Sequence, residues 1–262
     1  MSLGVAVLLG VLQGLTEFLP VSSSGHLALA QHLIPGFVQP GVVFDAMLHV
    51  GTAGAVIWFE RREIRRWLTS TSGRRLVGLL ILGTLATAVV AFPIKSVAEA
   101  AFLRPVWVGF ALLVTGLVVA ATKWMSGGPR DEAGTTWRQA MLIGLVQGMA
   151  VFPGLSRSGL TISSALGAGL DRSWAARFSF LLGVPAIAGV AVLEVFDERH
   201  ALAAAGFGYW SACLIGAVAA GLAGYLALTI VIKTLSSRVF HRFSWYCVPL
   251  GLVVIVLTWG QP

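Results

Sequence analysis

Six long apolar stretches dominate the chain, and nearly all of its charged residues lie between them. Each stretch approaches the roughly 20 residues that a helix needs to cross a bilayer. Only 11% of the 262 residues are charged and 57% are hydrophobic, whereas soluble domains are about 25% charged. The sequence therefore predicts an all-α integral membrane protein without a separate soluble domain. The expected spans are residues 42–59, 76–92, 105–122, 178–196, 209–232 and 245–259.

The basic residues indicate membrane topology, and we expect no nucleic-acid partner. The formal net charge is +7, but the 18 Lys and Arg residues lie almost entirely in loops between apolar runs, where such residues set orientation. Cys213 and Cys247 lie within apolar stretches, without the spacing of a metal site, and are expected to pack in the interior. No Lys or Arg precedes Arg61, so the first apolar run is expected to belong to the mature protein.

Two further apolar regions contain too many polar residues to be simple spans. Polar backbone at membrane depth is tolerated only where protein buries it or where it lines a wet cavity. Both regions are therefore predicted to be re-entrant helix-loop-helix pairs. The interruptions are Gln13, Glu17, Pro20 and Ser22 to His26 within residues 3–33, and Gln147, Pro153-Gly154 and Ser156 to Gly159 within residues 139–170.

The two interrupted regions are copies of one another. A shift of 134 residues, without a gap, places identical residues on each other from Gly10 on Gly144 to Val50 on Val184. A single offset held over this length indicates an internal repeat. Each repeat, at about 1–125 and 135–262, then holds one re-entrant pair and three spans. Because three is odd, the second repeat is predicted to be inverted, with the functional site near the midplane where the repeats meet.

The loop charges test this topology independently. If the first re-entrant pair opens outward, fourteen Lys and Arg residues lie in inner loops, three lie outside and Arg157 lies within the membrane. Cytoplasmic loops carry such an excess of basic residues. Both termini are therefore predicted to face outward, and the site is predicted to open to the periplasmic side.

Ionisable residues inside the membrane are costly, so each is a candidate functional residue. Gln13 and Glu17 are four residues apart and share one helix face. The Glu17 carboxylate could bind a divalent cation, Mg²⁺ or Ca²⁺, or act as a general base. The alternative is a buried, neutral Glu17 that is hydrogen-bonded across helices.

A turn rich in hydroxyl groups follows Glu17. Exposed N–H groups at the start of the next helix would form an anion site, and a serine near a histidine can act as nucleophile and base. Serine-rich turns also serve simply as helix caps. Pro20 ends the preceding helix, and the turn residues are Ser22, Ser23, Ser24, Gly25 and His26.

The second repeat adds a positive charge to the same turn, because Arg157 occupies the place of Ser23. A guanidinium binds phosphate bidentately, and nearby hydroxyls could add neutral donors from Ser156, Ser158 and Thr161. The alternative is a structural Arg157 paired with Glu17, which is compatible with catalysis. Carboxylate, hydroxyls, histidine and arginine together favour phosphoryl chemistry on a substrate anchored in lipid.

Other polar residues within the spans carry weaker predictions. Asp45, His49 and Thr52 form a stripe on one helix face, which either extends the site or packs as a buried network. Glu194 lies close to the outer end of its span and is expected to be interfacial. We assign no role to His32, His200 and His241.

The segments QGLTEFLPVSSSGH at 13–26 and PGLSRSGLT at 153–161 closely resemble the two signature motifs of the bacitracin-resistance type undecaprenyl-diphosphatases. The likeness extends over nearly the whole chain in length, motif order and span pattern. It implies an enzyme of the bacterial inner membrane that removes one phosphate from undecaprenyl diphosphate and regenerates the carrier lipid of cell-wall synthesis. Such enzymes are associated with bacitracin resistance, because the antibiotic sequesters the diphosphate lipid.

The resemblance also assigns residues. It places the family's acidic pair on Gln13 and Glu17, its serine-histidine turn on Ser22 to His26 and its arginine on Arg157. Gln13 carries no charge, so Glu17 must supply most of any metal or base role. In the expected mechanism, Ser23 attacks the terminal phosphorus, with Ser24 or water as alternatives, and His26 or Glu17 accepts the proton. Further substrate contacts are expected from Gln13, Ser22, Ser24, Gly25, Ser156, Ser158, Thr161, Asp45 and His49.

Two other functions remain open from the sequence. Inverted repeats with discontinuous helices are common in transporters, so a polyprenyl-phosphate transporter or flippase is the main alternative. The acid-phosphatase-like lipid phosphatases share fragments of both motifs, but they require a histidine where this chain has Ser163. The expected partners are the polyprenyl diphosphate substrate and membrane lipid, and a homodimer is consistent with the sequence.

Overall fold

The computed structural model describes residues 2–34, 42–203 and 205–260, and every regular element of three or more residues among them is helical. The sixteen-residue α1 begins where the Ser2 hydroxyl accepts from the Val5 N–H at 3.3 Å. The elements are α1 (Leu3–Phe18), α2 (Ser23–Leu33), α3 (Val42–Phe59), α4 (Arg61–Thr69), α5 (Thr71–Phe102), α6 (Pro105–Ala121), η1 (Thr122–Trp124), α7 (Trp137–Met149), α8 (Arg157–Gly167), α9 (Arg172–Asp197), α10 (Arg199–Ala203), α11 (Phe207–Ser236), η2 (Phe240–Phe243) and α12 (Ser244–Thr258).

The six predicted spans fall on α3, α5, α6, α9, α11 and α12. Within the described ranges, five helical stretches are long and apolar enough to cross a membrane, and α3 is a shorter apolar helix. Many large apolar side chains on these helices are exposed, which suits a surrounding of lipid. The chain is a multi-pass membrane protein.

Several helices extend beyond the predicted spans. Helix α9 begins at Arg172, six residues before the predicted start, because the Asp171 carboxylate caps it by accepting from the N–H groups of Ser173 and Trp174 at 3.0 and 3.1 Å. Helix α5 extends from Thr71 to Phe102 and contains Pro93. Apolar runs mark the membrane-facing middle of a helix, whereas its polar ends are set by caps.

The two interrupted regions are helix-break-helix pairs, as predicted. Helices α1 and α2 are separated by residues 19–22, and α7 and α8 by residues 150–156. Ser22 and Gly154 have positive φ angles of 68° and 94° in these breaks. Glycine adopts this conformation easily, but serine does so at a cost. The backbone at Ser22 is therefore strained where α2 begins.

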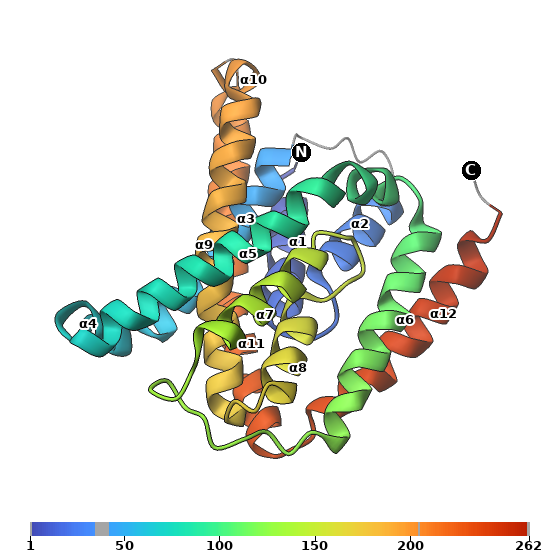
Figure 1. Ribbon diagram of the computed structural model, residues 1–262. Coiled ribbons are helices and arrows are strands. Elements are labelled where there is room, and N and C mark those ends of the chain that lie inside the picture. Colours follow the sequence, from blue (N-terminus) through green and yellow to red (C-terminus); the bar gives the residue numbers. More distant parts are fainter. Residues whose placement is uncertain (1, 35–41, 204, 261–262) are drawn as a thin grey trace.

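The broken helices lie at the centre and the long helices surround them (Figure 1). Helix α1 packs along α11, and α7 packs along α5. Helices α6 and α12 lie side by side at the right of the view, and α3 packs against α9 and α11. Residues 20–22 of the first break and 153–154 of the second are buried among these helices.

Glycines bring these helices into close contact at matching places in the two halves. A Cβ on Gly10 of α1 would collide with the carbonyl oxygen of Gly216 on α11, and one on Gly144 of α7 with that of Gly83 on α5. Gly10 and Gly144 are related by the 134-residue shift. Small residues that let backbones approach are typical of helix packing in membranes. Gly10 and Gly144 therefore hold equivalent positions in the two sequence copies, and each closely approaches a helix of the other half.

Helix α4 was not among the predicted elements, because its nine residues are too polar for a span. Its N-cap residue, Glu60, is buried and forms a bidentate pair with Arg177 of α9, in which Arg177 Nε donates to Glu60 Oε1 at 2.8 Å and Nη2 donates to Oε2. This pair joins the end of α3 to the first turns of α9.

We expect Glu60→Gln to lower the free energy of unfolding by about 3 kcal/mol, because Arg177 loses a buried charged partner. The measurement is the thermal unfolding midpoint of the detergent-solubilised protein. Glu99→Gln is the control, since Glu99 pairs with Lys95 at 3.6 Å on an exposed face and should cost less than about 1 kcal/mol. Equal effects of the two substitutions would contradict a structural role for the Glu60–Arg177 pair.

Candidate active site

The breaks of the two halves pack directly on each other. A Cβ on Gly25 would lie 3.2 Å from the Gly154 Cα atom, so the two breaks approach each other closely at this point. The Ser158 hydroxyl donates to the Leu19 carbonyl across the same junction at 3.0 Å. The starts of α2 and α8 are thereby held next to each other.

Glu17 lies at the centre of this junction, near the end of α1, and its side chain is only 5% exposed. Its Oε2 atom accepts a hydrogen bond from Ser23 Oγ at 2.5 Å and another from Gln13 Nε2 at 2.8 Å. Its Oε1 atom pairs with Arg157 Nη2. Residues of both predicted motifs therefore meet on one buried carboxylate.

Arg157 is the first residue of α8, and its side chain is 15% exposed. In addition to Glu17, the guanidinium contacts the Ser179 carbonyl on α9, to which Nη1 donates at 3.5 Å. The guanidinium also packs directly against Gly183, where a Cβ atom would collide with Arg157 Nη1 and lie 2.5 Å from Arg157 Cζ. Gly183 corresponds to His49 under the repeat shift. The absence of a side chain at this position in the second repeat is what admits the arginine.

His49 enters the cluster from α3. Its Nδ1 atom lies 2.8 Å from Gln13 Nε2 and 3.3 Å from Glu17 Oε2. The Thr52 hydroxyl donates to the His49 carbonyl at 2.8 Å. The predicted stripe on α3 is thus divided: His49 contacts the centre, Thr52 supports the backbone, and Asp45 accepts from Gln31 of α2 at 3.0 and 3.2 Å.

Most of the predicted hydroxyl donors hold the turns in place. Ser22 Oγ accepts from the Gly25 N–H and contacts Ser24 Oγ, both at 3.3 Å. Ser156 Oγ accepts from the Gly159 N–H at 3.1 Å, so it caps α8 as Ser22 caps α2. Ser158 contacts Leu19 as described above, and Thr161 donates to the Arg157 carbonyl at 2.7 Å. Ser23 differs from these residues because its hydroxyl donates to Glu17.

His26 lies on the first turn of α2, and its ring bonds to groups other than Ser23. The Nδ1 atom lies 2.7 Å from the Ser22 carbonyl oxygen and Nε2 lies 2.8 Å from the Tyr246 hydroxyl. Of the two proton acceptors expected for Ser23, Glu17 is therefore the one in hydrogen-bond contact with it.

The family model for "Bacitracin resistance protein BacA" matches residues 6–253. The chain belongs to the BacA family. Relatives named undecaprenyl-diphosphatase include a Carboxydothermus hydrogenoformans protein, 40% identical over 96% of both chains. Others are from Desulforapulum autotrophicum, 38% identical over 98% of both, and Methanosphaera stadtmanae, 34% identical over 97% of both.

The BacA family match covers every residue of the Glu17 cluster, from Gln13 to Arg157. It also covers three residues that sequence reasoning missed. Gly183 is found by extending the repeat shift to His49, but Ser179 and Tyr246 lie outside both motifs and no signal in the sequence marks them. Ser179 contacts Arg157 through the packing of α9, and Tyr246 contacts His26 through the packing of α12.

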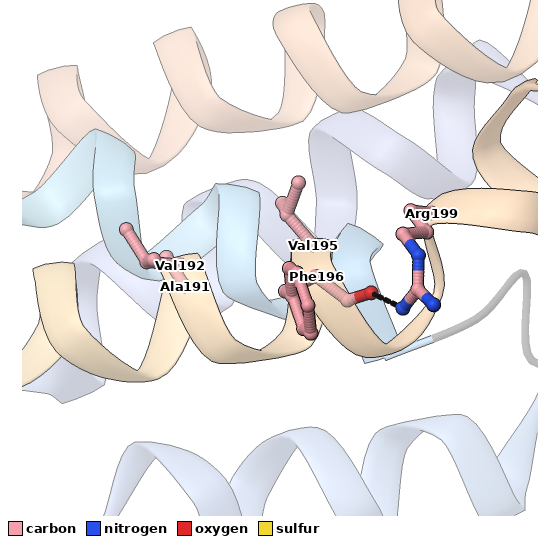
Figure 2. A pocket seen from close by; sticks show the side chains of 5 residues that line it. All are labelled: Ala191, Val192, Val195, Phe196 and Arg199. Carbon is pink, nitrogen blue, oxygen red and sulfur yellow. Dashed lines mark hydrogen bonds between the residues drawn. The ribbon is translucent and has the colours of Figure 1, made fainter.

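The C-terminal end of α9 carries a surface hollow that shares no residue with the Glu17 cluster (Figure 2). It is lined by Ala191, Val192, Val195, Phe196 and Arg199, and the Arg199 guanidinium bonds back to the Phe196 carbonyl at 2.7 Å. Active sites combine apolar walls with converging polar groups, so this hollow does not qualify. Glu194, nearby on the same helix, is half-buried, and its interfacial placement stays a prediction.

Proposed function

We propose that the protein hydrolyses undecaprenyl diphosphate to undecaprenyl phosphate and inorganic phosphate. The observation that carries this proposal is the convergence of Ser23 and Arg157 on the buried Glu17 carboxylate. A hydroxyl nucleophile, a carboxylate that takes its proton and a guanidinium that binds phosphate oxygens suit phosphoryl transfer. The names of the relatives support the substrate. Such an enzyme recycles the carrier lipid of peptidoglycan synthesis in the bacterial inner membrane and favours bacitracin resistance.

In the first step, Ser23 Oγ attacks the terminal phosphorus as the bond from phosphorus to the bridging oxygen breaks. The bonding electrons leave with undecaprenyl phosphate. The Ser23 proton moves to Glu17 Oε2, which already accepts it in a hydrogen bond of 2.5 Å. Arg157 stabilises the charge on the transferred group, and the positive end of the α2 dipole, where Ser23 is the first residue, favours an anion there.

In the second step, water hydrolyses the phosphoserine. Glu17 has released its first proton to solvent and now carries a water proton to the departing Ser23 oxygen. The remaining hydroxide becomes part of inorganic phosphate. Attack by water without a phosphoserine is the competing route, in which Ser23 only donates a hydrogen bond and Glu17 activates the water.

Ser23→Ala separates these routes. If Ser23 is the nucleophile, the substitution lowers turnover by at least about a thousandfold, and phosphoserine is absent from the variant. Turnover is measured as phosphate release, and the covalent intermediate as an 80 Da increase after a rapid acid quench. Ser211→Ala is the control, since that hydroxyl bonds to the Gly208 carbonyl of its own helix. Residual turnover above about a tenth of wild type would overturn serine attack.

We also propose that a divalent cation assists the hydrolysis and is held largely by phosphate oxygens of the substrate. Gln13 is fully buried and its Oε1 atom has no hydrogen-bond partner in the described part of the chain, so this oxygen and Glu17 fit as ligands. In the described ranges no three His, Cys, Asp or Glu side chains group closely enough to hold a metal ion. Mg²⁺ commonly takes one or two protein ligands together with phosphate oxygens and water, and it would supply charge neutralisation.

Phosphate release by detergent-solubilised protein, with and without EDTA, tests both proposals. A detergent micelle does not separate two aqueous compartments, so a transporter has no measurable activity in it. A phosphatase can still release phosphate there. We expect turnover that EDTA abolishes and Mg²⁺ or Ca²⁺ restores. Turnover unaffected by EDTA would overturn the proposed role of a divalent cation. Absence of turnover by protein that is folded and binds the lipid would favour a transport function. The relatives' names favour the enzyme.

We further infer an inverted repeat whose site opens to the periplasmic side. The matching glycine contacts of α1 with α11 and α7 with α5 support the repeat. In Figure 1, the C-terminal ends of α5, α9 and α12 lie toward the upper edge, as does the start of α11. The end of α6 and the start of α12 lie toward the lower edge. The excess of basic residues in the loops assigned to the cytoplasm favours the lower edge as that side.

Cysteine labelling tests the orientation. Leu68 on α4 and Leu103 after α5 are 77% and 80% exposed, and the native Cys213 and Cys247 are buried. We expect an impermeant thiol reagent to label Leu103→Cys in intact cells and Leu68→Cys only after permeabilisation. The reverse pattern would overturn the orientation. A homodimer remains a prediction, which cross-linking of the same variants would test.

A further inference from the structure

The first turn of α12 contacts the serine-histidine turn at two points. The Tyr246 hydroxyl lies 2.8 Å from His26 Nε2, and the two rings stack with centroids 5.7 Å apart and planes inclined by 14°. The adjacent residue, Cys247, is buried, and its thiol donates to the Pro20 carbonyl at 3.2 Å. Helix α12 therefore supports the break on both sides of Ser23.

The partners of the His26 ring determine which nitrogen carries the proton. A backbone carbonyl only accepts hydrogen bonds, so Nδ1, 2.7 Å from the Ser22 carbonyl oxygen, is the donor. In neutral His26, Nε2 is then the acceptor and the Tyr246 hydroxyl donates to it. The second nitrogen of a histidine is commonly set in this way by the bond that the first one makes.

We infer that Tyr246 is a positioning residue for the hydrolysis, acting through His26. This inference rests on the proposed function. His26 follows Ser23 by three residues on α2, so both side chains lie on one side of the helix. The stacked ring and the hydroxyl hold the imidazole in one orientation beside the nucleophile. When Nε2 takes a proton from solvent, the new N–H donates to the Tyr246 oxygen, so the hydrogen bond that orients the imidazole persists in both protonation states.

Tyr246→Phe tests the inference, because it keeps the stacked ring and removes the hydroxyl. We expect kcat to fall about tenfold, KM to stay within about twofold and the acidic limb of the pH-rate profile to move. In the His26→Ala background the same substitution should change kcat by less than about twofold, since coupled residues are not additive. Tyr225→Phe is the matched control, since Tyr225 packs edge-on against Phe59 instead.

A structural role alone would lower kcat equally with and without His26 and leave the pH profile in place, which would overturn the inference. Ring ¹⁵N shifts of His26 provide a readout independent of turnover: we expect Nδ1 protonated in wild type, and an Nε2 shift that changes in Tyr246→Phe. An unchanged Nε2 shift would overturn the hydrogen bond itself. Absence of turnover in wild type would reject the proposed function together with this role, whereas wild-type turnover with an unaltered Tyr246→Phe rejects this role alone.

Discussion

Glu17→Gln is expected to lower phosphate release by at least about a thousandfold. The amide has nearly the shape of the carboxylate but cannot take the proton that Ser23 donates to Oε2 at 2.5 Å. It also removes the negative charge that holds Arg157 in place. The measurement is the initial rate of phosphate release at saturating substrate, with the thermal midpoint recorded on the same sample.

Glu60→Gln is the matched control for this loss. Glu60 is also a buried carboxylate paired with an arginine, but it joins α3 to α9 outside the breaks. Its substitution is expected to lower the thermal midpoint and to change the rate by less than about threefold at a temperature where the variant is folded. A Glu17→Gln rate within tenfold of wild type would contradict the assignment of Glu17 as the proton acceptor.

Gly183→Ala is expected to lower turnover by about a hundredfold while the protein remains folded. The new methyl group would occupy the position of the Arg157 guanidinium. Because a guanidinium is the far end of a flexible side chain, it can move aside at little cost to folding. Displacement of a positioned group by about 1 Å commonly costs a hundredfold in rate.

Gly189→Ala provides the control on the same helix, since a Cβ at Gly189 meets no atom within 4 Å. Both substitutions add one methyl group to α9, so any general effect of alanine on helix stability is shared. We expect normal turnover in Gly189→Ala. If Gly183→Ala also retained normal turnover, then the observed position of Arg157 would not matter for the reaction.

The fold was largely predictable, because apolar stretches and polar interruptions are local properties of the sequence. All six predicted spans coincide with helices, five of which are long and apolar enough to cross a membrane, and both breaks were located in this way. Helix α4 was missed because a polar helix at a membrane surface has no apolar run. The helix ends at Arg172 and Phe102 were missed because caps and polar final turns, rather than apolarity, set them.

The site was predictable only in part, for physical reasons. Glu17, Ser23 and Arg157 were predicted because a charge or a hydroxyl-rich turn at membrane depth is costly and therefore informative. The sequence left Ser24 and water open as alternatives to Ser23, since neighbouring hydroxyls in one turn share the same local pattern. Only the folded chain places Ser23 on Glu17 and Ser24 beside Ser22. Tyr246 depends on how α12 packs against α2, which no local pattern encodes.

The most direct test of the central claim is ³¹P NMR of undecaprenyl diphosphate incubated with the detergent-solubilised protein and Mg²⁺. The account predicts that inorganic phosphate and undecaprenyl phosphate appear in a one-to-one ratio, and that neither appears with Arg157→Ala. Release of pyrophosphate would mean that the bond to the prenyl carbon breaks instead. An unchanged diphosphate spectrum, with protein that is folded and binds the lipid, would contradict a phosphatase and assign the same residues to recognition.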